Sequence, residues 1–167
     1  MSRPAYHFEW DPAKADQNLS KHKVGFEEAV GVFRDPEALT LYDESHADRE
    51  ERWITLGQDR PGRLEVLVHT FAEVAPDEFR VRVVSARRAK PSGARDLREP
   101  TMKDEYDFSR AERGKFFRPD AELHLPVYLD QAIAAYLSER ASSKGVELNR
   151  LVNDLLKRDI ELIESMK

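Results

Sequence analysis

The sequence predicts an α+β chain of two small units: an antiparallel sheet with two helices near its N-terminus, then a strand and two helices that dimerise. Three observations support this. Alternating apolar runs fill the first 90 residues, Pro, Gly and Ser gather just after them, and the last fifty residues are too few for a core of their own. The 167 residues fit one domain or two small ones at about 100–200 residues per domain.

The N-terminal elements are predicted by capping residues. Residues 6–10 are aromatic and favour a short strand. Asp11 and Pro12 then predict a helix start, because Asp accepts hydrogen bonds from free backbone N–H groups and Pro tolerates the first helical position. This helix is expected to run to about Lys23, and a second, short amphipathic helix covers residues 26–33.

Four further strands are predicted from alternating or apolar runs separated by turn residues. The turns are Asp59-Arg60-Pro61-Gly62 and Ala75-Pro76-Asp77. The resulting element order is βααββββ, which is typical of an antiparallel α+β unit. The four strands are expected at residues 39–42, 52–57, 63–71 and 79–86. In the last of them, alternation predicts that Phe79, Val81 and Val83 face the core and that Arg80 and Arg82 project from the opposite face.

A domain boundary is predicted at residue 90, where the strand pattern ends. The division is into residues 1–90, a linker at 91–118 and a second unit at 119–167. Met102 and the polar residues after it read like the start of an independent polypeptide. This is typical of two genes joined in frame, whether in nature or by design.

The second unit is predicted to be a strand at 122–129, a helix from Asp130 to Lys144 ended by Gly145, and a second helix from about Leu148. A lone strand has no ladder partner, and the apolar stripe of the last helix is too wide for so small a monomer to cover. We therefore expect a homodimer that pairs strand with strand.

Charge and composition exclude several classes of protein. The net charge is −5, yet residues 80–98 hold seven basic residues against one acid, a local charge of +6 that suits a polyanion. With no cysteine and five histidines outside zinc-binding spacings, we expect neither a metal nor a cofactor. No apolar run approaches the length of a membrane span, so the chain is expected to be cytoplasmic.

Several motifs of the first unit resemble those of BrnT-type toxins, over about residues 6–90. The resemblance implies a RelE-like fold and cleavage of RNA that arrests translation. The motifs are Phe8-Glu-Trp-Asp-Pro, Asn18-x-x-Lys-His22, Phe26-Glu-Glu-Ala29, Glu51-Arg52 and Val83-Val-Ser-Ala-Arg87.

Metal-free RNA cleavage needs a proton acceptor, cations for the developing charge and a proton donor. His22 is the titrating candidate, although a helix-terminal histidine bonded to nearby carbonyls is an equal alternative. Trp10 and Trp53 are expected to be core residues. The predicted catalytic residues are Lys21, His22, Arg52, Arg82 and Arg87, with Arg80 and Arg88 as RNA contacts; an exposed arginine such as Arg80 is also consistent with a solubilising face.

Residues 119–167 resemble a ribbon-helix-helix DNA-binding domain, and the second half as a whole resembles BrnA-type antitoxins. The antitoxin motifs lie at residues 103–109, 113–116, 125–130 and 148–156. The resemblance implies that this half neutralises the toxin and represses its operon. His124 and Tyr128 would then contact operator bases and Asn149 a backbone phosphate; the alternative is a dimerisation module that never contacts DNA.

Five residues before the second unit are predicted to mask the toxin. The acids would imitate phosphate groups over the arginines and the aromatic residues would anchor them, either within one chain or swapped between chains. A disordered tail has a similar composition. The five are Asp104, Glu105, Tyr106, Asp107 and Phe108.

A second reading of the whole chain is a DNA-binding repressor with a catalytically dead toxin module. BrnT-type toxins usually close with a helix after the Ser-Ala-Arg stretch, whereas Pro91 and Gly93 oppose a helix there.

Overall fold

The computed structural model describes residues 3–46, 50–89 and 106–167. They belong to two compact units, Met1–Pro126 and Val127–Lys167, and each is described here by itself. The unit boundary thus falls later than the boundaries at 90 and 118 expected from composition, because residues 106–126 pack on the first unit. Lys90, Asp104 and Glu105 lie outside the described residues.

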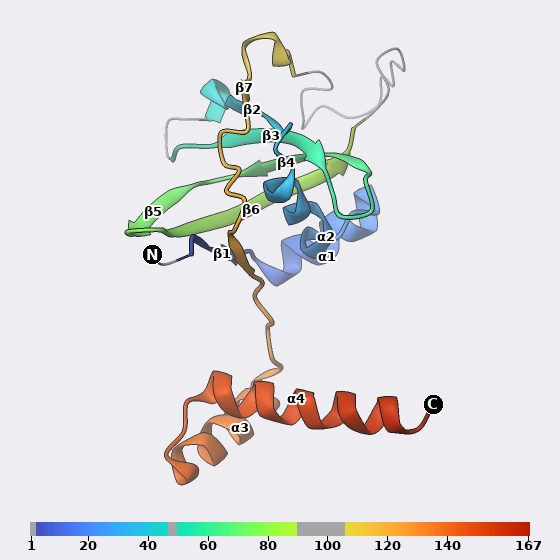
Figure 1. The fold of residues 1–167 in the computed structure, drawn as a ribbon, viewed down its shortest axis with the longest axis vertical. Helices are drawn as coiled ribbons and strands as arrows, with labels where there is room; N and C mark the ends of the chain where they lie inside the picture. The colour runs from blue at the N-terminus through green and yellow to red at the C-terminus, as the bar shows by residue number, and fades with distance from the viewer. Residues whose placement is uncertain (1–2, 47–49, 90–105) are drawn as a thin grey trace. The chain divides into compact units, whose positions relative to one another are not determined.

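The first unit is built on an eight-stranded sheet (Figure 1). The strand order is β7-β2-β3-β4-β6-β1-β8, and β5 pairs with β6 outside that path. The strands are β1 (Ala5–Glu9), β2 (Leu39–Tyr42), β3 (Trp53–Gln58), β4 (Leu64–His69), β5 (Ala72–Ala75), β6 (Glu78–Arg88), β7 (Glu112–Arg113) and β8 (Glu122–His124).

Two helices follow β1, as the capping residues predict. Helix α1 (Pro12–His22) starts at Asp11, whose Oδ1 accepts hydrogen bonds from the backbone N–H groups of Ala13 and Lys14. Lys23 ends it in the left-handed conformation, at φ 57°. Helix α2 (Phe26–Ala29) continues directly into the 3₁₀ turn η1 (Val30–Arg34).

The sheet is mixed, which corrects the expectation of an antiparallel sheet. β1 pairs in parallel with both β6 and β8, whereas β2, β3, β4 and β6 are antiparallel neighbours. Apolar alternation determines which face of a strand is buried but says nothing of its direction relative to a distant partner. The helices after β1 carry the chain away from its neighbour, so no hairpin sets the direction of β1.

Strand β5 is absent from the sequence prediction, which placed a turn over its end. All four of its residues are exposed, so this strand lacks the alternation of buried and exposed residues by which a half-buried strand is recognised. Its pairing with β6 depends on the turn between them, in which Asp77 has a φ of 60°.

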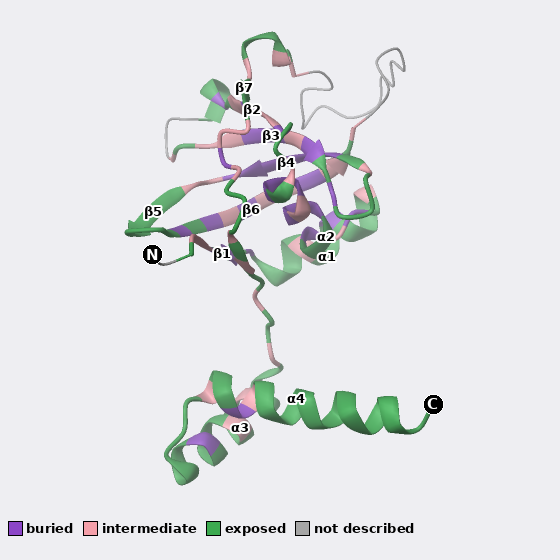
Figure 2. Cartoon of the chain, viewed as in Figure 1, coloured by how far each residue is buried: buried purple, intermediate pink, exposed green. Residues whose placement is uncertain are grey.

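The main core lies between the helices and one face of the sheet. Figure 2 shows buried residues along β3, β4 and β6 and on the inner sides of the helices. The alternation predicted for β6 is confirmed, because Phe79, Val81 and Val83 are buried in this core. Tyr6, Phe8, Trp10, Val24, Phe26, Ala29, Val30, Val32, Phe33, Leu67, Ala86 and Phe116 complete it.

One core residue comes from far along the chain. Residues 106–124, here called the strap, contain β7 on the β2 edge of the sheet and β8 on the β1 edge. Between them Phe116 enters the core, where its ring stacks on Phe71 with a centroid distance of 4.1 Å. The Tyr6 hydroxyl donates a hydrogen bond to the Phe116 carbonyl oxygen at 2.7 Å. The strap therefore borders both edges of the sheet and fills part of its core.

The strap also covers a second apolar cluster of the same unit. Tyr106 and Phe108 pack against a cluster centred on Ile54, Val66 and Val68. These three residues alternate along β3 and β4 with residues of the main core, so they lie on the opposite face of the sheet. The strap thus contacts both faces.

The second unit contains helices α3 (Gln131–Lys144) and α4 (Leu148–Ser165), close to the predicted bounds. Gly145 ends α3 at φ 63°, as expected. Two expectations are wrong. Asp130 lies at the N-cap of α3 but its side chain makes no capping hydrogen bond. The strand expected at 122–129 is only Glu122–His124, and it pairs with β1 of the first unit.

The helices of the second unit leave most of their apolar side chains exposed, as Figure 2 shows. Leu151 and Ala141 are its buried hydrophobic residues within the described ranges. Ile133, Tyr136, Leu155, Leu156, Ile160, Leu162 and Ile163 are all exposed. None of the helices in the described ranges is long and apolar enough to cross a membrane.

Candidate functional site

Two of the predicted catalytic arginines lie together around one carboxylate. Glu50 Oε1 accepts hydrogen bonds from Arg52 Nε at 3.1 Å and Arg52 Nη2 at 2.9 Å. Its Oε2 accepts one from Arg82 Nη2. Arg52 precedes β3 and Arg82 lies in β6, so the cluster joins two strands that are not sheet neighbours.

The charge balance of this cluster favours an ionised Glu50. Partial burial alone would raise the pKa of Glu50, but hydrogen bonds from Arg52 and Arg82 and their positive charges lower it below its usual value. Both guanidinium groups are partly exposed. A phosphate group could therefore replace Glu50 as the shared acceptor, because guanidinium groups bind carboxylates and phosphates with the same geometry.

Lys21 and His22 lie in the last turn of α1, at the far end of β6. Asn18 fixes this turn, because its Nδ2 donates to the carbonyl oxygens of Val24 and Ala86, each at 2.9 Å. Its Oδ1 accepts from the Ala86 backbone N–H at 3.1 Å. Since Arg87 directly follows Ala86, the C-terminal turn of α1 lies at the end of β6 that carries this arginine.

The five predicted catalytic residues therefore form two groups. Arg52 and Arg82 lie with Glu50, whereas Lys21 and His22 lie toward Arg87. Arg82 and Arg87 are five positions apart in one strand, which corresponds to about 16 Å at 3.3 Å per residue. One phosphate group cannot contact both arginines, but an extended RNA strand can.

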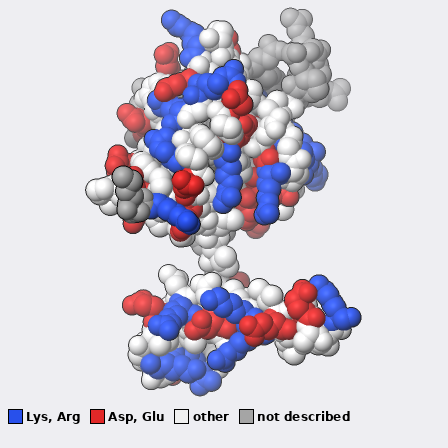
Figure 3. All heavy atoms as spheres, in the orientation of Figure 1, with Lys and Arg blue, Asp and Glu red and all other residues white. Residues whose placement is uncertain are grey.

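The predicted RNA contacts lie at opposite ends of β6. Arg80 pairs in register with His7 of β1, and Arg88 pairs with Glu65 of β4. On the face of this unit drawn in Figure 3, basic and acidic side chains alternate and do not gather in one patch. Within the described residues, the arginines of the basic run are thus spread along β6.

A buried histidine that sequence reasoning missed lies inside the sheet. His69 is fully buried, and burial lowers its pKa to about 4. Its Nδ1 lies 3.1 Å from the Thr70 carbonyl oxygen and donates to it, so Nε2 accepts from the Thr55 hydroxyl at 2.8 Å. Thr55 in turn accepts from Thr40 at 3.0 Å. Because it is fully buried, His69 is a core residue without contact to solvent.

The predicted masking residues within the described ranges contact the sheet of the first unit through the rings of Tyr106 and Phe108. The Arg87 guanidinium carbon lies 5.9 Å from the centre of the Tyr106 ring, a cation–π contact. Burial, together with the charge of Asp43, raises the pKa of Tyr106. Asp107 makes a local contact, because its Oδ1 accepts from the Ser109 backbone N–H at 2.9 Å.

The three predicted DNA contacts are divided between the two units. His124 lies on β8, where its ring stacks on His7 at 4.9 Å and its Nε2 is 3.6 Å from Glu122. Tyr128 is half exposed and belongs to the second unit. Asn149 lies in the first turn of α4, where its carbonyl oxygen accepts from Asn153 Nδ2 at 2.8 Å.

Residues 10–92 match the family described as the ribonuclease toxin BrnT of type II toxin-antitoxin systems. This part of the chain is therefore a BrnT-like ribonuclease toxin domain. The match ends before the strap.

Among solved structures, the chain is similar to the ribonuclease toxin BrnT of Brucella abortus. The two are 19% identical over 52% of this chain and 99% of the Brucella chain, with a TM-score of 0.34. No curated protein matches the sequence.

Proposed function

We propose that the chain is a type II toxin–antitoxin pair in one polypeptide. The BrnT domain cleaves RNA without a metal and thereby inhibits translation, and the strap neutralises it. Residues 119–167 form a ribbon-helix-helix homodimer that binds operator DNA. The observation that carries the proposal is Phe116, a residue beyond the family match that is buried in the core of the toxin domain.

Cleavage is assigned to the two cationic groups, one beside the middle of β6 and one at its C-terminal end. Arg52 and Arg82 stabilise the charge that develops on the phosphate, and the Lys21–His22 end supplies proton transfer. Glu50 either holds the arginines in place or accepts the 2′-hydroxyl proton. Its hydrogen bonds to both arginines support a positioning role in the full chain.

The strap neutralises the toxin domain by occupying both edges of its sheet. It supplies the outer neighbours of β1 and β2, so neither edge is open to another strand. Tyr106 also covers one side of the Arg87 guanidinium. RNA that binds along β6 therefore competes with the strap at Arg87.

The test is RNA cleavage in the presence of chelator by the full chain and by residues 1–98, whose folding is first checked by circular dichroism. We expect cleavage by residues 1–98, loss of that cleavage when residues 102–167 are added, and little cleavage by the full chain. Arg82→Ala should abolish cleavage by residues 1–98, and Arg60→Ala, in an exposed turn, should not.

The competing function is a repressor whose toxin module is catalytically dead. Pro91 and Gly93 support it, because both residues oppose the helix with which BrnT-type toxins usually close. A folded fragment 1–98 that does not cleave RNA would support this reading and contradict the proposal.

The DNA-binding half of the proposal is supported by the exposed apolar surface of α3 and α4. A second copy of the unit would bury that surface. The proposed ribbon uses residues 122–129, of which Glu122–His124 are paired with β1. Fluorescence anisotropy with DNA from upstream of the coding region should show binding that weakens with salt and with Tyr128→Ala.

A further inference from the structure

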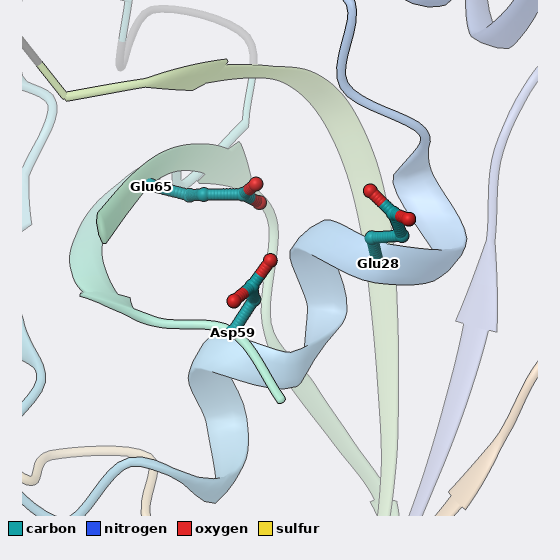
Figure 4. Close-up of side chains that lie close together, drawn as sticks. All are labelled: Glu28, Asp59 and Glu65. Carbon is teal, nitrogen blue, oxygen red and sulfur yellow. The ribbon is translucent and has the colours of Figure 1, made fainter. Parts of the chain in front are cut away.

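Three carboxylates of the toxin domain face one another away from the arginine cluster (Figure 4). Glu28 comes from α2, Asp59 from the turn after β3 and Glu65 from β4. One carboxylate oxygen of each lies within 4.8 Å of those of the other two. The Glu65 carboxylate points toward that of Asp59 in Figure 4.

Glu65 is the residue that requires an explanation. It is fully buried, and neither of its carboxylate oxygens has a hydrogen-bond partner. The Asp59 side chain beside it is fully buried as well. A buried carboxylate without partners is so costly that it must hold a proton or contact a cation.

Arg63 balances only part of this charge. Its Nε donates to Asp59 Oδ2 and its Nη2 to Glu28 Oε2, both at 2.8 Å. One guanidinium group thus contacts two of the three carboxylates and leaves the oxygens of Glu65 without a donor.

We propose that Glu28, Asp59 and Glu65 bind a divalent cation that prefers oxygen ligands, of the Ca²⁺ type. Oxygen atoms on opposite sides of a bound Ca²⁺ are separated by about 4.6–5.2 Å, twice the usual Ca–O distance, so the carboxylates need little movement. Each carboxylate oxygen has two lone pairs, which allows Arg63 to keep its hydrogen bonds.

The surroundings of Glu65 disfavour its negative charge. Burial and the charges of Asp59 and Glu28 raise its pKa to about 7, against the opposing charges of Arg63 and Arg88. A cation bound between the three carboxylates would supply the positive charge that Glu65 lacks.

The bound cation would join α2 to the turn between β3 and β4. The turn η1, which continues α2, already lies close to that turn, since a Cβ atom on Gly31 would be 3.1 Å from the Arg60 backbone nitrogen. Arg52 and Asp59 flank the six residues of β3, which places the acids about 20 Å from the arginine cluster. The proposed site is thus structural, and its test does not depend on RNA cleavage.

The experiment uses the full chain stripped with chelator, and it measures Tm and calorimetric binding with Ca²⁺, Mn²⁺ or Mg²⁺ at millimolar concentration. We expect Ca²⁺ to raise Tm by at least about 3 °C and chelator to reverse the rise. Glu65→Gln should remove the shift. Glu27→Gln, the neighbouring exposed acid of α2, is the matched control and should keep it.

Glu28→Gln provides a second variant if Glu65→Gln does not fold, because Glu28 is exposed and its replacement should weaken binding without unfolding the chain. The proposal is overturned if none of the three cations shifts Tm or releases heat on binding. It is also overturned if the folded variants respond to Ca²⁺ as the unaltered chain does.

Discussion

At the scale of single residues, two buried titratable groups act on stability in opposite directions. Folded Glu65 keeps its proton to about pH 7, so its contribution is present below the unfolded pKa and is lost as pH rises through the folded one. Folded His69 resists protonation to about pH 4. Its contribution is therefore present above the unfolded pKa and is lost as pH falls.

The pH dependences that Glu65 and His69 give to the free energy of unfolding nearly cancel between pH 4.5 and 6.5, which are the ordinary pKa values of the two groups. In Glu65→Gln the pH dependence that comes from His69 is no longer offset. We therefore expect the free energy of unfolding of this variant to rise by about 2–3 kcal/mol from pH 4.5 to 6.5. Urea unfolding in chelator across this range measures it. A variant profile parallel to that of the unaltered chain would contradict the prediction.

Asn18 is a second residue whose role comes from burial. Its amide group makes three hydrogen bonds to the backbone and holds the end of α1 against β6. Asn18→Ala should cost about 2–4 kcal/mol, because buried backbone groups lose their partners. Gln17→Ala, exposed on the same helix, should change the urea midpoint little; equal losses would count against this role.

At the scale of elements, the strap depends on one glycine. Gly114 has a φ of 63°, and a Cβ atom there would lie 2.9 Å from the Pro36 carbonyl oxygen. Gly62 is also left-handed, at φ 86°, but a Cβ atom there meets nothing within 4 Å. Alanine at Gly62 would therefore introduce backbone strain alone, whereas alanine at Gly114 would add a steric clash.

We therefore expect Gly114→Ala to loosen the strap and Gly62→Ala to have a smaller effect, of about 1 kcal/mol. Hydrogen exchange of residues 106–124 measures it. Exchange should become faster in the Gly114 variant alone, and unchanged protection in both variants would show that the strap tolerates the clash.

At the scale of the whole molecule, the second unit predicts association. Leu156 and Ile163 on α4 are more than half exposed, as are several of their apolar neighbours. Burial of such side chains is worth about 1.5–3 kcal/mol each. The full chain should thus sediment as a dimer, and a Leu156→Glu, Ile163→Glu double variant as a monomer.

Leu19→Glu provides the matched control, since Leu19 is a half-exposed leucine on a helix of the toxin domain. It should leave the sedimentation coefficient unchanged. A monomeric unaltered chain at micromolar concentration would contradict the dimer prediction.

Local signals in the sequence determined most of the elements. Asp11 and Pro12 predicted the start of α1, and Gly145 predicted the end of α3, because caps act within one helical turn. Alternation in β6 correctly placed Phe79, Val81 and Val83 in the core. Apart from Phe8 and Glu9, the toxin motifs lay within the part of the chain that matches the BrnT family.

Tertiary structure alone decided how distant segments meet. The parallel pairing of β1, the burial of Phe116 and the meeting of Glu28 with Asp59 and Glu65 depend on contacts between residues far apart in sequence. The expectation of no metal came from the spacing of cysteine and histidine in the sequence. Acids contributed by three separate elements have no fixed spacing in the sequence, so they could not be found in that way. Periodicity and caps report local conformation, whereas these contacts depend on the whole chain closing around one core.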